Sequence, residues 1–337
     1  LKEVYGEILD QFGKSEFVGY FNDSVEAKIL AIVQGEAVTP HAGSGDMVEI
    51  VLQKTPFYAE MGGQVGDKGV ILTETGKIEI QDTQTPLSDV IVHVGKVIEG
   101  VTQIGQLATA YVDKEKRVAT CKNHTATHIL HWALGKVLGK HVKQAGSYVD
   151  DKRLRFDFVH TQALTEDELS KVEKLANERI FENSPVKFYE TSFISAKESG
   201  AVALFGEKYD EQVRVLEVGD FSKELCGGTH VSRTGEIGLF KIVNEESVGA
   251  SLRRIEACTS FRALDFIEQE EQVLNKLSCL LKTGHGELEQ AVEGLIAKSQ
   301  EKDKELQLLQ GQLIKSQVAG ILSEAKEVDG AKVVLST

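Results

Sequence analysis

The pattern of apolar and polar residues changes character twice along the chain. From residue 17 to about residue 112, short β-type runs of apolar residues alternate with glycine-containing turns. Many short strands separated by turns are typical of a small barrel or sandwich. The pattern predicts strands at residues 27–33, 47–52, 69–72, 77–80, 90–94 and 106–112.

Residues 113–260 mix a helical period with a strand period. The first helix is expected at about residues 123–138, with a core stripe of Ile129, Leu130, Ala133, Leu134, Val137 and Leu138. Alternation at residues 154–158, after the turn-like Asp150-Asp151, predicts a hairpin. Helix against antiparallel sheet makes this segment an α+β domain.

Later in the same segment, Thr165 and Glu168 have the spacing of a capping box. They predict an amphipathic helix that ends near residues 183–185. Strands are expected to follow at residues 186–193 and 213–218.

From residue 261 glycine becomes rare, and Glu, Lys, Gln and Leu dominate. Leucine and valine fall on a rough heptad, which predicts a helical hairpin or coiled coil over residues 261–328, broken at Gly284-His285-Gly286. Residues 1–16 are expected to be the tail of a preceding helix, and residues 329–337 the start of a further domain. The expected fold is therefore α+β and multidomain: a barrel-like domain at 17–112, an α+β domain at 113–260 and a helical segment.

Composition narrows the class of protein. Four cysteines show no framework spacing, so a reducing compartment such as the cytoplasm is expected. The chain has neither a run of about eighteen apolar residues nor a signal-peptide pattern. A formal net charge of -14 argues against nonspecific nucleic-acid binding by the whole chain. Residues 111–155, however, hold ten basic and four acidic residues, which fits an RNA-contacting surface and a solvated face equally well.

Two residue pairs carry the candidate chemistry. His124 and His128 lie four residues apart, which on a helix places both imidazoles on one face. Cys226 and His230 flank a Gly-Gly turn about a hundred residues later. Either pair alone occurs by chance, and Cys226 alone reads as a small buried apolar residue. Together they complete a four-ligand nitrogen and sulfur set, which predicts one zinc ion.

Three motifs of this sequence resemble the editing region of alanyl-tRNA synthetases, and they occur along the chain in the order in which that family has them. They are the segment Asn123 to His131, the loop Glu224-Leu225-Cys226-Gly227-Gly228-Thr229-His230, and the stretch Phe57-Tyr58-Ala59-Glu60-Met61-Gly62-Gly63-Gln64-Val65-Gly66-Asp67. The resemblance covers about residue 17 to about residue 260. The same region of the sequence is similar also to freestanding alanyl-tRNA editing proteins and, more distantly, to the editing domain of threonyl-tRNA synthetase.

The resemblance implies hydrolysis of the ester in alanine tRNA mischarged with serine or glycine. It also implies a parent enzyme that ligates alanine to its tRNA with ATP, through an aminoacylation domain absent from these residues. Zinc would polarise or orient the substrate, or make hydroxide. Four protein ligands are more typical of a closed structural zinc site than of a catalytic one. We therefore favour a zinc ion that positions the substrate over one that forms hydroxide.

Further site residues are expected from position or from the resemblance. Thr127 lies one residue before the candidate ligand His128 on the same helix, so its side chain is expected to line the same cavity. Its hydroxyl is equally able to bond back to a helix carbonyl, as mid-helix threonines commonly do. The resemblance places Gln144 and the glycine loop in the pocket. With Cys226, the expected catalytic set is Thr127, Gln144 and Gln64, and the expected tRNA contacts are Gly62, Gly63, Arg253 and Arg254.

Alternatives remain open at this point. A zinc peptidase would carry glutamate where Thr125 stands, so that interpretation is weak. A zinc-stabilised RNA-binding module without turnover, or a freestanding editing hydrolase, also fits the motifs. Arg253 and Arg254 are as readily explained by ion pairs with Glu256 or Glu246. His131 is expected to pack or to form a hydrogen bond that supports a metal ligand, with contact to the substrate as the lesser alternative. The irregular heptads leave open whether the helical region forms a homo-oligomer.

Overall fold

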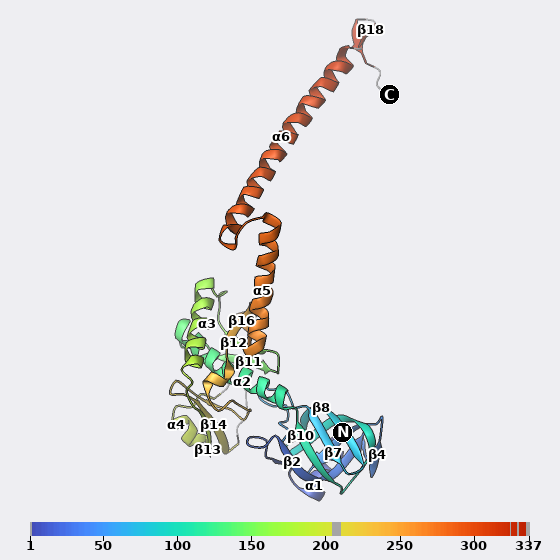
Figure 1. Cartoon of the computed structure of the whole chain (residues 1–337), viewed down its shortest axis with the longest axis vertical. Helices are drawn as coiled ribbons and strands as arrows, with labels where there is room; N and C mark the ends of the chain where they lie inside the picture. The colour runs from blue at the N-terminus through green and yellow to red at the C-terminus, as the bar shows by residue number, and fades with distance from the viewer. Residues whose placement is uncertain (1, 204–209, 324, 329, 335–337) are drawn as a thin grey trace. The chain divides into compact units, whose positions relative to one another are not determined.

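The computed structural model describes residues 2–203, 210–323, 325–328 and 330–334. The chain divides into two compact units, Leu1–Phe266 and Ile267–Thr337, which are described separately. Figure 1 shows the first unit in blue to yellow and the long helices of the second in orange and red.

A closed antiparallel barrel forms the first half of unit one. Hydrogen bonds link β10, β7, β8, β9, β5 and β2 in that order, and β10 pairs with β2 to close the ring. Its apolar centre includes Ile32, Ile50, Phe57 and Ile78, all fully buried. The strands are β2 (Ser24–Gln34), β5 (Met47–Leu52), β7 (Gly69–Thr73), β8 (Gly76–Leu87), β9 (Val90–Gln103) and β10 (Leu107–Val112). The barrel-like expectation is confirmed.

Two of the expected barrel strands were too short. β8 and β9 form a long hairpin, whereas the sequence predicted only residues 77–80 and 90–94. Register shifts interrupt their pairing at three places, and each shift breaks the period-two pattern on which the prediction depended. Short pairings surround the barrel: β1 (Glu16–Phe17) with β6 (Lys54–Thr55), β3 (Ala37–Val38) with β2, and β4 (His41–Gly43) with β9.

The helix α1 (Lys2–Phe12) packs on the barrel. Tyr5 and Ile8 are buried against Val33, Val51 and Val92, in a cluster separate from the barrel centre. The helix ends at Phe12, within the segment 1–16 expected to be helical, because Gly13 adopts a positive φ of 75° and donates its N–H to the carbonyl of Leu9. The first residues thus cover one outer patch of the barrel.

The second half of unit one is α+β, as predicted. Helix α2 (Lys114–Val137) begins nine residues before the expected start, because the side chain of Asp113 caps it by accepting from the N–H of Lys116. Of the expected stripe, Ile129, Leu130, Ala133 and Leu134 are fully buried, whereas Val137 and Leu138 at the end of the helix are only partly buried. It packs on a four-stranded antiparallel sheet in the order β11 (Gln144–Val149), β12 (Leu154–Val159), β17 (Leu252–Thr259) and β16 (Phe240–Gly249).

Helix α3 (Glu166–Phe181) lies in the same core and begins with the predicted capping box of Thr165 and Glu168. A second sheet, in the order β13 (Val186–Ser192), β14 (Gln212–Val218) and β15 (Ser222–Leu225), contains the two predicted strands and one that the sequence did not predict. The short elements α4 (Phe193–Glu198) and η1 (Thr234–Ile237) were also not predicted.

The barrel and the α+β half are joined by buried polar contacts. The guanidinium of Arg117 on α2 forms an ion pair with Asp67 and donates to the carbonyls of Gly19 and Pro56. The glycine loop of the barrel also extends along β11, since the N–H of Val149 donates to the carbonyl of Gly63. The first contact fastens barrel residues to the first turns of α2, and the second fastens the glycine loop to β11.

The long helical segment is interrupted near Gly284-His285-Gly286, where the sequence predicts a break. Helix α5 (Ser260–Leu281) starts in the first unit, and η2 (His285–Glu287) precedes α6 (Leu288–Ser323). No side chain of α6 is buried, so its apolar heptad positions are not packed within the described part of the chain. The short strands β18 (Lys326–Val328) and β19 (Ala331–Val333) pair antiparallel, and residues 329 and 335–337 of the expected final segment lie outside the described residues. No described helix combines the length and apolar character needed to span a membrane.

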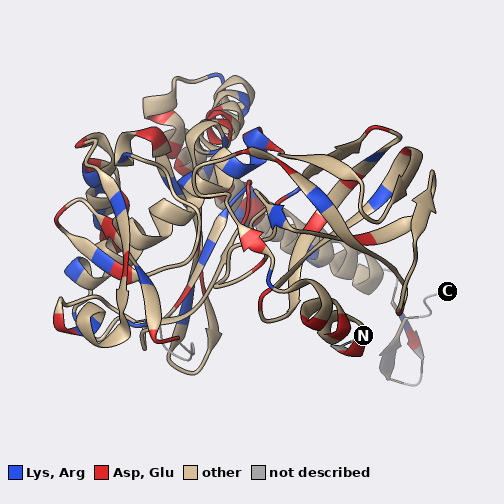
Figure 2. Cartoon of the chain, turned by 90° about the horizontal axis from the view of Figure 1, so that it is seen from below, with Lys and Arg blue, Asp and Glu red and all other residues tan. Residues whose placement is uncertain are grey.

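Charges are distributed in a way that bears on nucleic-acid binding. Figure 2 shows acidic and basic residues interspersed along both halves of unit one. Within the basic segment 111–155, ion pairs engage Lys114, Lys116, Arg117, Arg153 and Arg155. Half of its cations are thus already neutralised by neighbouring carboxylates, which weakens the interpretation of this segment as an RNA surface.

Candidate metal centre

Helix α2 supplies the first two candidate ligands from one face. The rings of His124 and His128 stack with their centroids 5.3 Å apart and a 17° angle between their planes. This is the arrangement that four-residue spacing gives on a helix. Both residues are buried, because the helix packs between the sheets and the barrel loop.

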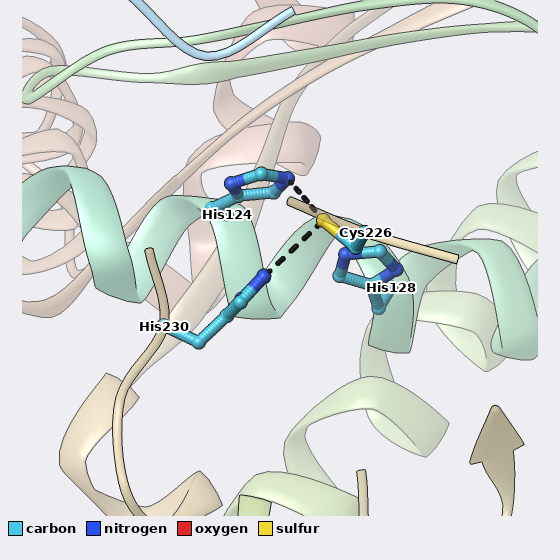
Figure 3. Close-up of side chains that lie close together, drawn as sticks. All are labelled: His124, His128, Cys226 and His230. Atoms are coloured by element: carbon cyan, nitrogen blue, oxygen red, sulfur yellow. Dashed lines mark hydrogen bonds between the residues drawn. The ribbon is translucent and has the colours of Figure 1, made fainter. Parts of the chain in front are cut away.

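The loop after β15 brings Cys226 and His230 to the same point. The nearest ligand atoms of His124, His128, Cys226 and His230 all lie within 4.8 Å of one another. The sulfur of Cys226 is 3.4 Å from Nε2 of His124 and 3.3 Å from Nε2 of His230. Figure 3 shows the sulfur between these two nitrogens, with the ring of His128 beside it. The structure therefore brings together all four residues that the sequence proposed as ligands.

Gln64 of the barrel holds the first imidazole in a fixed orientation. Its carbonyl oxygen accepts from Nδ1–H of His124 at 2.7 Å and from the N–H of Thr229 at 2.9 Å. Its amide nitrogen donates to Oγ1 of Thr229 at 2.8 Å. Since Nδ1 of His124 carries the proton in this arrangement, Nε2 has a free lone pair on the side of the sulfur.

The other two imidazoles are held in the same way. Nδ1–H of His128 donates to Glu224 at 2.6 Å. Nδ1–H of His230 lies 3.2 Å from the hydroxyl of Thr125, which itself donates to the carbonyl of Cys121. Metal-binding histidines in general donate the second ring N–H to a carboxylate, carbonyl or hydroxyl, which sets the tautomer needed for ligation.

His128 provides the test of whether a metal fits. Its Nε2 atom is buried and has no hydrogen-bond partner among the described residues. A buried polar atom without a partner costs about 1–3 kcal/mol. A cation bound by this atom, the sulfur and the other two Nε2 atoms would satisfy it. The nitrogen and sulfur donor set is the one that zinc prefers.

The electrostatics of the cluster favour a thiolate. Burial alone would raise the pKa of the Cys226 thiol, but the imidazoles of His124, His230 and His128 together hold this pKa well below its ordinary value. Burial likewise opposes ionisation of Glu224, yet its contact with His128 lowers the pKa of Glu224 to about 2. Only the thiolate form of cysteine ligates a metal, and the shift in the pKa of Cys226 is in the direction of that form.

A cavity of about 200 Å³ lies beside the cluster. His124, His128 and Cys226 form one part of its wall, and the wall also includes the predicted residues Gly62, Thr127 and Gln144. The hydroxyl of Thr127 donates to the carbonyl of Asn123 at 2.9 Å, and Gln144 donates to Ser147 at 3.2 Å. Acceptor lone pairs of Thr127 and the carbonyl of Gln144 remain available to a ligand.

The remaining predicted residues lie elsewhere. Gln64 is fully buried behind His124, and Gly63 packs against Ser147 on β11 with a φ of +85°. Arg253 pairs with Glu245, whereas Arg254 pairs with Asp157 and Glu246, and neither arginine lines the cavity. The ion-pair alternative thus holds for Arg254 and Glu246, while Glu256 pairs with Arg153.

Several residues of the site were not identified from the sequence. Glu224 contacts both His128 and His131, and its place two residues before Cys226 in the loop motif was a usable signal. Arg214 lines the cavity and donates to the carbonyls of Cys226 and Gly228. Tyr20 donates to the carbonyl of Gly227 from a distant turn of the barrel, for which the sequence contains no signal.

Comparison with known proteins places this site in a family. Residues 1–116 match the model described as class II (A) tRNA synthetases, and residues 213–256 match the threonyl and alanyl tRNA synthetase second additional domain. An alanine–tRNA ligase of Pelotomaculum thermopropionicum is 46% identical over 98% of this chain, and one of Petrotoga mobilis is 43% identical over 99%.

The second matched segment contains Arg214, Glu224, Cys226 and His230, so it covers one of the two candidate ligand pairs. This chain spans 38% of the length of each of these two relatives. Over that stretch, the chain belongs to the alanyl-tRNA synthetase family.

Proposed function

We propose that this chain hydrolyses the ester of alanine tRNA that has been mischarged with serine or glycine. The observation that supports the proposal is the cluster of His124, His128, Cys226 and His230 beside a small cavity lined by Thr127 and Gln144. An ester needs little activation compared with an amide, so orientation of substrate and water would supply much of the rate enhancement. In the parent enzyme, ligation of alanine with ATP would belong to residues outside this chain, and its partner would be alanine tRNA in the cytoplasm.

The four residues of the cluster would hold one zinc ion. When bound, zinc would polarise the ester or orient the amino or hydroxyl group of the substrate. The chain's own residues would do the remaining work: Gln64, Glu224 and Thr125 fix the imidazoles, and the residues that line the cavity would hold the substrate beside them. With four protein ligands, orientation is favoured over the formation of hydroxide.

Thr127 and Gln144 are proposed to read the serine hydroxyl. Both line the cavity and retain hydrogen-bonding capacity there. Gln64, which the sequence also proposed for this contact, has both ends of its amide bonded to His124 and Thr229, so we assign it to holding the ligand. A site that bonds a hydroxyl leaves polar groups unpaired when alanine enters, and this difference would spare correctly charged tRNA.

The terminal tRNA contacts are proposed at the glycine loop. Gly62 lines the cavity, and its lack of a side chain leaves room for a ribose or phosphate to approach the backbone. Arg253 and Arg254 would have to exchange carboxylate partners for phosphates before contacting RNA.

A zinc-stabilised RNA-binding module is the second candidate, because four protein ligands would close the coordination shell. Turnover separates the two functions. The chain is mixed with alanine tRNA charged with serine, glycine or alanine, with and without a zinc chelator. We expect hydrolysis of the serine and glycine esters, loss of activity with chelator, and roughly 100-fold slower hydrolysis in Cys226→Ala. Binding of the tRNA without turnover would instead support the RNA-binding module.

Thr127→Val tests the reading of the side chain. This variant keeps the shape but removes the hydroxyl, so the ratio of serine-ester to alanine-ester hydrolysis should fall roughly 10-fold or more. An unchanged ratio would show that Thr127 does not read serine.

A further inference from the structure

The turn between the ligands Cys226 and His230 is held by its carbonyl groups. Nη1 of Arg214 donates to the carbonyl of Cys226 at 3.2 Å and to the carbonyl of Gly228 at 2.7 Å. The hydroxyl of Tyr20 donates to the carbonyl between them, that of Gly227, at 2.6 Å. Three successive carbonyls are therefore bound by two side chains, one from β14 and one from the barrel.

Arg214 is itself held between two aromatic rings. The centre of its guanidinium lies 3.9 Å from the ring centroid of Tyr20 and 3.7 Å from that of Phe188. Such stacking is a use of arginine that lysine does not reproduce, because the guanidinium is planar and has a fixed fork of donors. Tyr20 thus both stacks on Arg214 and binds the same turn.

The charge of Arg214 has an unusual set of partners. Glu190 lies opposite Arg214 on β13 and acts on its charge, but the two side chains form no ion pair in the described structure. The Nε atom of Arg214 is buried without a hydrogen-bond partner in the part of the chain that the structure describes. Half-buried arginines are as a rule paired with carboxylates. Here the positive charge acts on the carbonyl dipoles of the metal-ligand turn and on the faces of two rings.

Other contacts hold the two ends of this turn: the N–H of Cys226 donates to the carbonyl of Arg214, and Gln64 bonds the N–H and the hydroxyl of Thr229. Two glycines lie between these ends. Gly227 and Gly228 have the widest backbone freedom of any residue type, so an unrestrained turn would sample many orientations of the Cys226 side chain. In the cluster the sulfur of Cys226 lies 3.4 Å and 3.3 Å from two of the imidazole nitrogens, so its orientation decides whether the four ligand atoms meet. The hydrogen bonds that Arg214 and Tyr20 donate to the three carbonyls restrict the backbone of the turn, and with it the orientation of the Cys226 side chain, when no metal is bound.

Resting on the proposed zinc centre, we propose that Arg214 and Tyr20 form a clamp that positions the Cys226 turn for metal binding. Both are positioning residues, since they act through the ligand's backbone. Tyr20 precedes β2 of the barrel, so the barrel contributes to the metal centre through this clamp as well as through Gln64.

The test measures zinc affinity of the full chain by competition with a coloured chelator. Residues that orient ligands typically contribute 10–100-fold to metal affinity. We expect Arg214→Met to lose about that much, and Tyr20→Phe to lose roughly 10-fold because one carbonyl bond is removed. Arg214→Lys should fall between the parent and Arg214→Met, since an ammonium donates to a carbonyl but does not stack between two rings.

Arg179→Met is the matched control. Arg179 is also half-buried and stacks on two rings, at 4.9 Å from Trp132 and 5.2 Å from Phe221, but it does not touch the ligand turn. We expect it to change stability without changing zinc affinity. Cobalt(II) in place of zinc provides a spectroscopic check, because the thiolate-to-cobalt absorption should weaken in Arg214→Met at a cobalt concentration that saturates the parent.

Two results would overturn the clamp. One is a zinc affinity of Arg214→Met within about twofold of the parent, well below the change expected for a residue that orients a ligand. The other is an equal loss in Arg179→Met, which would reduce the effect to general stability. Neither result depends on catalysis: a parent that binds zinc but does not hydrolyse esters fails the proposed function and leaves the clamp intact, and a parent that binds no zinc fails both.

Discussion

Gly228 is a residue at which a single added carbon would obstruct His124, a candidate metal ligand. A Cβ atom at this position would lie 2.1 Å from Cε1 of His124 and 2.8 Å from Oε1 of Gln64. Both of those groups are packed and bonded to each other, so neither is free to move away. The Gly-Gly turn is therefore required by the close approach of α2 as well as by its own curvature.

We expect Gly228→Ala to bind zinc roughly 100-fold more weakly, because His124 must leave its position or the turn must withdraw Cys226. Gly227→Ala is the control: a Cβ there would meet only the flexible end of Met61, at 3.3 Å. Zinc affinity measured with a competing chelator compares the two variants. Equal affinities of Gly228→Ala and Gly227→Ala would contradict the proposed steric role.

Glu224 shows how one buried residue serves two others. Its two carboxylate oxygens accept from Nδ1–H of His128 and of His131. This explains the position of His131 next to the ligand pair without any contact with the cavity. His131 thus bonds to the carboxylate that holds the candidate ligand His128, and not to a ligand directly.

At the scale of elements, α2 is the part on which the site depends. It carries two ligands and Thr127, and its first turns are fastened to the barrel by Arg117. Nε of Arg117 lies 2.9 Å from both carboxylate oxygens of Asp67, and the N–H of Tyr58 also donates to that carboxylate. Both charged groups are buried, so each depends on the other for compensation.

Removal of one partner leaves the other charge buried and unpaired. Arg117→Met should therefore lower the free energy of unfolding by about 3–5 kcal/mol. The double variant Asp67→Asn with Arg117→Met should recover part of this loss, because no charge is then left uncompensated. Urea unfolding followed by circular dichroism provides the measurement. Additive losses in the double variant would show that the two side chains do not act as a pair.

At the scale of the whole molecule, the site belongs entirely to the unit Leu1–Phe266. Its stability therefore depends on both the barrel core and the α+β core. Inside the barrel, His93 is fully buried and bonds to the carbonyl of Ile50 through Nδ1 and to the hydroxyl of Thr55 through Nε2. Burial lowers the pKa of His93 from 6.5 to about 4.

This lowered pKa predicts acid destabilisation. In the unfolded chain His93 has its ordinary pKa of 6.5 and is protonated below that pH, whereas in the folded chain its pKa is about 4 and it stays neutral down to that pH. Stability is thus complete above the unfolded pKa and is lost as pH falls through this window, by on the order of 3 kcal/mol. We expect the drop in unfolding free energy between about pH 7 and about pH 4.5 to be smaller in His93→Gln than in the parent.

The comparison of parent and variant cancels the titration of the other histidines, including those of the cluster. Urea titrations at the two pH values measure it. An identical pH dependence in both proteins would mean that His93 is protonated in the folded state without cost.

The sequence by itself determined the local parts of this protein. The stripe of α2, the capping box of α3 and the ligand pairs His124/His128 and Cys226/His230 were all predicted, because each depends on spacings of a few residues along one element. The same locality explains the errors. The hairpin β8–β9 has register shifts that disrupt its period, and the start of α2 depends on a cap rather than on apolar residues.

Only the tertiary structure decided which distant groups complete the site. Gln64 and Tyr20 reach the ligands from the barrel, Arg214 clamps the turn from β14, and Arg253 and Arg254 turn to carboxylates on neighbouring strands. These contacts join residues separated by as many as 207 positions. The sequence around a polar side chain on one strand does not indicate which residue on another strand it will contact. Periodicity records which face of an element is buried, whereas the packing of elements decides what that face meets.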